Sequence, residues 1–89
     1  MKGSAMTVEK QLEILMKMIR PRTGARGFVK LPRPIFIENY RNVIPNPVKL
    51  SFNRGDGKFC QVNALRGDLR RDTGNLYIRK EKYEAAICG

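Results

Sequence analysis

The first regular pattern of apolar residues in the chain lies between Thr7 and Arg20. Its apolar residues recur every three or four positions: Val8, Leu12, Leu15, Met16 and Ile19. This spacing predicts an amphipathic helix, with Thr7 as its N-cap and Pro21 as its stop. We expect the helix to pack on a sheet of its own chain, and a contact with a second copy or another protein is the alternative.

Two shorter elements are predicted after this helix. Phe28 to Leu31 has the composition of a short strand. The segment 34–43 is interpreted as a second helix, because Pro34 suits the first position of a helix. Its apolar contacts would come from Ile35, Ile37, Tyr40 and Ile44.

The clearest pattern is a β-hairpin in the middle of the chain. Val48, Leu50 and Phe52 alternate with polar residues, which is typical of a half-buried strand. The segment 53–57 supplies turn residues, and 58–65 alternates again, with Cys60 and Val62 on the same face.

The remaining sequence predicts a polar loop over 66–75, a third strand from Leu76 to Arg79 and a helix over 80–87. We therefore expect an α+β fold: a small antiparallel sheet or open β-barrel-like core, with an N-terminal amphipathic helix and short flanking helices. Residues 6–89 would form a single small basic domain. Residues 1–5 are expected to be an expression remnant or disordered.

The charge of the chain narrows the class of partner. Among 89 residues, 18 Lys and Arg outnumber 8 Asp and Glu, which gives a net charge of +10 and a pI near 10.2. Nucleic acid, an anionic membrane or an acidic protein would suit such a surface, and a basic surface without a partner is the remaining alternative. No apolar run approaches the roughly 20 residues of a membrane span, so an intracellular protein without a membrane partner is expected.

The basic residues gather in two segments. The span 17–33 contains no acidic residue and is interrupted by prolines and glycines, so it is predicted to be an irregular loop. The candidate phosphate-binding residues of this first segment are Arg20, Arg22, Arg26, Lys30 and Arg33. Those of the second segment are Arg66, Arg70 and Arg71. If the sheet brings both segments to one edge, they would form two arms that grip a duplex, with Arg forks on the phosphates.

Two acidic residues bear on the second segment. Asp68 and Asp72 lie next to Arg70 and Arg71 in the sequence, so they would either hold these guanidinium groups or neutralise them. Stacking on single strands is the less favoured interpretation, because the four phenylalanines are assigned to the core and only Tyr77 is expected to face outward. These phenylalanines are Phe28, Phe36, Phe52 and Phe59.

Catalysis and cofactor binding lack suitable residues. The chain has no histidine, and its two cysteines, Cys60 and Cys88, are expected to be free thiols rather than a disulfide or metal site. The acidic residues fit helix-surface pairs and turns. We therefore expect a protein that is not an enzyme and needs no metal or other cofactor.

Several stretches together resemble the plant B3-type DNA-binding domain over about residues 28–87. The sequence FVKLPRPIFIENY resembles its strand, proline and short helix; VKLSF and GDGKFCQV resemble its hairpin; and LYIRKEKYEAAI resembles its late strand and helix. The resemblance implies an open seven-stranded barrel with two basic arms in the major groove, at 22–33 and 66–71, and a nuclear transcription regulator. The chain departs from the family at the hairpin tryptophan, which is Phe59 or Cys60 here, and in its N-terminal helix.

The sequence thus predicts a non-enzymatic nucleic-acid-binding domain that holds duplex DNA with two basic loops. One alternative is a protein-interaction module that docks its basic face on an acidic partner. Another is an RNA-binding or ribonucleoprotein component, since the charge argument is the same for both nucleic acids.

Overall fold

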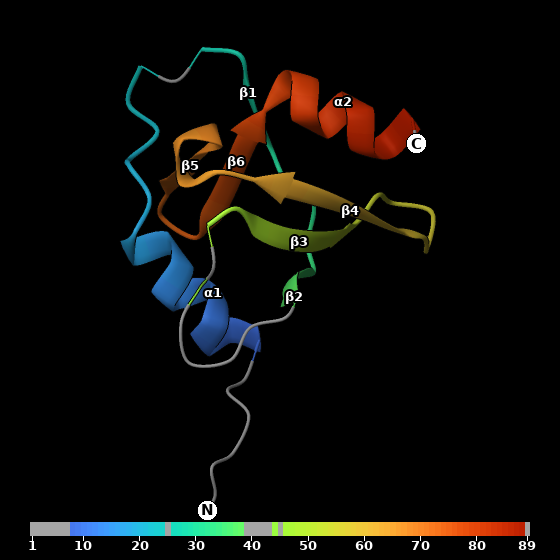
Figure 1. The fold of residues 1–89 in the computed structure, drawn as a ribbon, viewed down its shortest axis with the longest axis horizontal. Coiled ribbons are helices and arrows are strands. Elements are labelled where there is room, and N and C mark those ends of the chain that lie inside the picture. The colour runs from blue at the N-terminus through green and yellow to red at the C-terminus, as the bar shows by residue number, and fades with distance from the viewer. Residues whose placement is uncertain (1–7, 25, 39–43, 45, 89) are drawn as a thin grey trace, which may run out of the picture.

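The computed structural model describes residues 8–24, 26–38, 44 and 46–88. Its elements, in chain order, are α1 (Val8–Lys17), β1 (Phe28–Lys30), β2 (Ile35–Glu38), β3 (Val48–Asn53), β4 (Phe59–Ala64), the short 3-10 helix η1 (Arg66–Asp68), β5 (Leu69–Asp72), β6 (Asn75–Arg79) and α2 (Lys80–Cys88). Figure 1 shows α1 and α2 on different sides of the strands.

The strands form two antiparallel sheets of three strands each. Sheet A has the order β1-β6-β5, and sheet B has the order β2-β3-β4. The predicted α+β class and antiparallel pairing are confirmed. Both sheets are open, so the expectation of a barrel-like core is replaced by two separate sheets that share one apolar interior.

The core takes apolar residues from α1 and from both sheets. Leu15, Leu50 and Phe52 are fully buried, and the core continues into sheet A through Leu69 and Ile78. Helix α1 contributes Leu12, Leu15 and Ile19 to this core, so its most apolar positions face its own chain as favoured from the sequence. The helix ends at Lys17 rather than Arg20, and the predicted cap Thr7 lies outside the described residues.

The helix predicted over 34–43 is wrong for its first part, because residues 35–38 form β2. Ile35 and Ile37 are buried, whereas Phe36 and Glu38 are only half-buried, so the burial follows the period of a strand. All four residues pair with β3, which supplies the hydrogen-bonding partner that a β-branched segment needs. Residues 39–43 lie outside the described part of the chain.

The central hairpin is confirmed. β3 and β4 pair along their whole length, from Val48 opposite Ala64 to Asn53 opposite Phe59. Its turn needs left-handed backbone at Gly55, with φ of 106°. The assignment of Phe59 to the core is wrong: it is 49% exposed on the outer face of sheet B, with its ring centroid 5.7 Å from that of Phe36.

The polar loop predicted over 66–75 is also wrong, because it contains η1 and β5. Leu69 is fully buried and pairs with Ile78 of β6. One apolar residue among charged neighbours gives no periodic signal, so the strand depends on pairing with β6. The turn between β5 and β6 has Gly74 at φ 87°, a conformation that favours glycine.

The last strand and the last helix are as predicted. Leu76 and Ile78 of β6 are buried, and Tyr83, Ala86 and Ile87 of α2 pack against the core. The Tyr83 ring stacks on Phe52 with a centroid distance of 5.6 Å. Neither α1 nor α2, the helices of the described residues, is long and apolar enough to cross a membrane.

The buried face of α1 gives a stability prediction. Leu15→Ala removes a side chain that is 0% exposed, so we expect the free energy of unfolding to fall by about 2–5 kcal/mol in urea denaturation. Met18→Ala, at a residue that is 44% exposed, is the matched control and should change it by less than about 0.5 kcal/mol. Equal effects of the two substitutions would contradict the packing of α1 described above.

Candidate nucleic-acid interface

The two basic segments meet at β5. The backbone N–H of Arg22 donates to the carbonyl of Arg71 at 2.7 Å, and the N–H of Arg71 donates to the carbonyl of Arg20 at 3.1 Å. Pro21 and Arg71 form an isolated parallel bridge. The segments therefore touch at one edge of sheet A, as the sequence argument required, and they do not stand apart there as two separate arms.

The outer face of sheet A carries cations and aromatic rings. Residues opposite one another in an antiparallel pair point to the same face, and so do residues two apart on one strand. Lys30 and Arg70 both lie opposite Tyr77, and Phe28 lies opposite Arg79. We call these five residues, together with Arg22, the cationic face. The opposite side of the same strands carries the core residues Leu69 and Ile78.

Guanidinium groups lie over both rings of the cationic face. The Cζ of Arg22 is 4.6 Å from the centroid of Tyr77. The Cζ of Arg70 is 4.8 Å and that of Arg79 is 5.2 Å from the centroid of Phe28. Each such contact contributes about 0.5–1 kcal/mol at an exposed site.

Tyr77 of β6 also forms a hydrogen bond with Asp72 of the neighbouring strand β5. Its hydroxyl donates to the Oδ2 of Asp72 at 2.6 Å. This hydrogen bond lowers the pKa of Asp72 below its ordinary 3.8 and raises the pKa of Tyr77 above its ordinary 10.0. The stabilising contribution of Asp72 is therefore present above pH 3.8 and is lost as the pH falls through its lowered pKa. The stabilising contribution of Tyr77 is present below pH 10.0 and is lost as the pH rises through the raised pKa of its hydroxyl.

The carboxylates of Asp68 and Asp72 form no ion pair with Arg70 and Arg71, which lie between them in the sequence. Asp68 forms ion pairs with Arg79, at 2.8 Å, and with Lys82, at 3.7 Å. Asp72 accepts its hydrogen bond from Tyr77. No described carboxylate forms an ion pair with Arg70 or Arg71, so the expectation that Asp68 and Asp72 hold these two guanidinium groups is wrong. Asp68 instead pairs with Arg79, another cation of the cationic face.

Three of the predicted phosphate-binding arginines hold the fold together. Arg66 donates from Nη2 to the carbonyl of Ile44 at 2.9 Å, and its Nε is buried without a partner. Arg71 donates from Nε to the carbonyl of Ile19 at 2.9 Å. Arg33 donates to the carbonyl of Gly74. These guanidinium groups are engaged by main-chain carbonyls of distant segments, so they are less available to a ligand than Arg22, for which no hydrogen bond of the guanidinium group is found among the described residues.

The other predicted cations lie at or near the cationic face. Arg20, Arg22, Arg26 and Lys30 are exposed, and Arg70 is half-buried. Arg70 donates from Nη1 to the carbonyls of Gly67 and Leu69, at 2.8 and 2.7 Å, which fixes its position over Phe28. None of these five forms an ion pair with a described carboxylate.

Two open grooves flank the basic segment 20–27. The larger, of about 720 Å³, has Arg22, Arg26 and Phe28 on its walls and extends to Thr73. The smaller, of about 430 Å³, lies between Arg20, Arg26 and Arg70. Cations therefore line both sides of the segment, where an anionic chain could pass.

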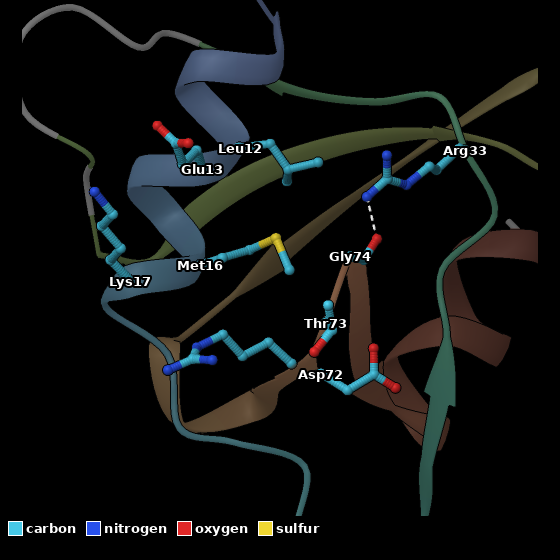
Figure 2. A pocket seen from close by; sticks show the side chains of 9 residues that line it. Leu12, Glu13, Met16, Lys17, Arg33, Asp72, Thr73 and Gly74 are labelled. Atoms are coloured by element: carbon cyan, nitrogen blue, oxygen red, sulfur yellow. Dashed lines mark hydrogen bonds between the residues drawn. The ribbon is translucent and has the colours of Figure 1, made fainter.

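A separate pocket of about 550 Å³ lies between α1 and the turn after β5 (Figure 2). Leu12 and Met16 of α1 give it apolar walls. Arg33 approaches from the opposite side and is hydrogen-bonded to Gly74, as the dashed line in Figure 2 shows. This pocket has apolar walls, unlike the two cationic grooves. Arg33 lines this pocket and neither of those grooves.

Sequence reasoning missed Phe28 and Arg79 as members of the cationic face. Phe28 was assigned to the core, whereas it is half-buried beneath two guanidinium groups. The outward expectation for Tyr77 is confirmed, and the strand period then places Arg79, two residues later, on the same face. That alternation was the available signal for Arg79.

Within the described residues, no group of three or more potential ligands could hold a metal ion. Cys60 is buried and Cys88 is exposed, and both are free thiols as expected.

No family model, curated protein or solved structure matches the chain. The resemblance to the B3 domain therefore stays a prediction.

The Asp72–Tyr77 hydrogen bond yields a titration prediction. In Asp72→Asn the carboxylate charge is lost, so the pKa of Tyr77 should fall back toward 10.0. NMR titration of isotope-labelled tyrosine rings measures this value. Asp56→Asn, in the distant hairpin turn, should leave the Tyr77 titration unchanged, and an unchanged pKa in Asp72→Asn would contradict the interaction.

Proposed function

We propose that this protein binds nucleic acid through the cationic face and the adjoining segment 20–27, without catalysing a reaction. The observation that carries the proposal is the pair of backbone hydrogen bonds that join Arg71 to Arg20 and Arg22. They place the acid-free basic segment beside a sheet face that carries Lys30 and Arg70. Several cations thus gather over one surface, as binding to a polyanion requires.

The electrostatics of the surface support a phosphate ligand. The two carboxylates nearest the face already have partners, since Asp72 is bonded to Tyr77 and Asp68 to Arg79 and Lys82. The exposed Arg22 and Arg26 form no ion pair with a carboxylate of the described residues. The charge of Arg22 nevertheless lies near enough to Asp72 to contribute to the lowered pKa of that carboxyl. Guanidinium groups offer two parallel donors to a phosphate, which suits this ligand better than an ammonium group does.

The shape of the surface bears on how a ligand would lie. Two arms on either side of a duplex would need separated basic segments, but here Arg20–Arg22 is hydrogen-bonded along β5. A nucleic-acid backbone would therefore run along one face of the domain, through the grooves beside segment 20–27. Regulation of transcription in the nucleus rests on the B3 resemblance and remains a hypothesis.

The salt dependence of binding tests the proposal. If about six phosphates are neutralised, log affinity for duplex DNA should fall against log salt concentration with a slope near −5. Arg22→Gln, Arg26→Gln and Lys30→Gln should each make the slope shallower by about 0.9. Fluorescence anisotropy across a salt series measures both quantities.

The matched control is Lys58→Gln, which removes an exposed positive charge from the β3–β4 turn. It should leave the slope unchanged, because Lys58 lies outside the cationic face. A slope near zero for the wild type, or equal effects of Lys58→Gln and Arg26→Gln, would overturn the proposal. Displacement by polyglutamate as effectively as by DNA would instead favour an acidic protein partner.

A further inference from the structure

The cationic face has a second property besides charge: it presents two layered aromatic platforms. In one, the Arg22 guanidinium covers Tyr77; in the other, the guanidinium groups of Arg70 and Arg79 cover Phe28. Nucleobases stack both on aromatic rings and on guanidinium planes. At Tyr77 a base can lie over the Arg22 guanidinium, or on the ring after Arg22 turns to a phosphate. At Phe28 the base would lie over the guanidinium groups, because Arg70 and Arg79 are held by hydrogen bonds to other groups.

The register fixes the separation of the two platforms. Phe28 lies opposite Arg79 and Lys30 lies opposite Tyr77, so Phe28 and Tyr77 are diagonal neighbours on one face. Diagonal neighbours of an antiparallel pair are about 7–8 Å apart. Successive stacked bases of a duplex strand rise only about 3.4 Å, so stacked neighbours would not reach both platforms.

Duplex and single-stranded nucleic acids differ in whether the faces of their bases are accessible to a protein. In a duplex the faces of each base are covered by its neighbours, and only the edges and the phosphates are accessible. In a single strand the bases can be splayed apart and can offer their faces to the protein. Resting on the nucleic-acid binding proposed above, we infer that the ligand of the cationic face is single-stranded DNA, with successive bases stacked at Tyr77 and Phe28.

The charges around the platforms suit such a strand. Lys30 lies directly opposite Tyr77 in the β1–β6 pair. Arg26 lines both grooves beside segment 20–27, and Phe28 lines them too. Phosphates that flank a splayed base would meet these cations. Deoxyribose favours a sugar pucker that separates successive phosphates more than ribose does, so the wide spacing of the platforms favours DNA over RNA.

The test compares three labelled ligands by anisotropy: a short oligo-dT strand, a duplex of the same length and oligo-U. Wild-type protein should bind oligo-dT more tightly than either of the others. Tyr77→Leu should weaken oligo-dT binding by about 5- to 150-fold, the loss expected for one stacked base. The matched control Tyr77→Phe keeps the ring and loses only the hydroxyl that bonds Asp72, so it should retain much more of the oligo-dT binding than Tyr77→Leu does.

A second variant avoids dependence on the folding of Tyr77→Leu. Arg22 is exposed, so Arg22→Lys should leave the fold intact while keeping the charge and removing the planar group. It should weaken oligo-dT binding by a larger factor than duplex binding, because the duplex loses only the two parallel donors of Arg22 to a phosphate, whereas oligo-dT also loses the plane on which a base stacks. Equal weakening of both ligands would contradict stacking on Arg22.

The outcomes separate this inference from the proposed function. Salt-dependent binding that is equal for oligo-dT and duplex, with Tyr77→Leu and Tyr77→Phe alike, would overturn the stacking inference and retain nucleic-acid binding. Tighter binding of oligo-U than of oligo-dT would overturn the assignment to DNA. Absence of binding to all three ligands would overturn the proposed function itself.

Discussion

The position of Arg71 is the constraint on which the candidate interface depends. Its backbone N–H and carbonyl bond to Arg20 and Arg22, while its side-chain Nε donates to the carbonyl of Ile19 just after α1. One residue of β5 therefore fixes the end of the α1 region, the course of the basic segment and the edge of sheet A. These three hydrogen bonds fix the residues on both sides of Pro21 and so help to place Arg22 above Tyr77. Phosphate binding by Arg71 stays a prediction, and its hydrogen bonds position the residues around it.

The arginines in and near the candidate interface have two different roles. Arg33, Arg66 and Arg71 donate to main-chain carbonyls and hold separate segments together. Arg22 and Arg70 lie over aromatic rings, and Arg70 also donates to carbonyls within its own segment. The net charge of +10 is therefore an incomplete guide to binding capacity, because part of it contributes to the fold. The division follows from burial and from which carbonyls are in reach.

Local patterns predicted the elements that carry their own periodic signal. The alternation of Val48, Leu50 and Phe52 specified β3, and the helical spacing of Leu12, Leu15 and Ile19 specified α1. β2 and β5 were missed for physical reasons. The segment 35–38 is too short for its period to separate strand from helix, and β5 has Leu69 as its single apolar residue. Both become strands because a neighbouring strand pairs with their backbone.

For the candidate interface, the sequence alone determined the excess of positive charge, the acid-free span 17–33 and the outward direction of Tyr77. These are properties of composition and of local period, which need no knowledge of distant contacts. Only the tertiary structure decided that the two basic segments touch, that Phe28 lies on the outer face and that Asp68 pairs with Arg79 rather than Arg70. Each of these depends on the register between strands that are distant in sequence, and local spacing does not specify that register.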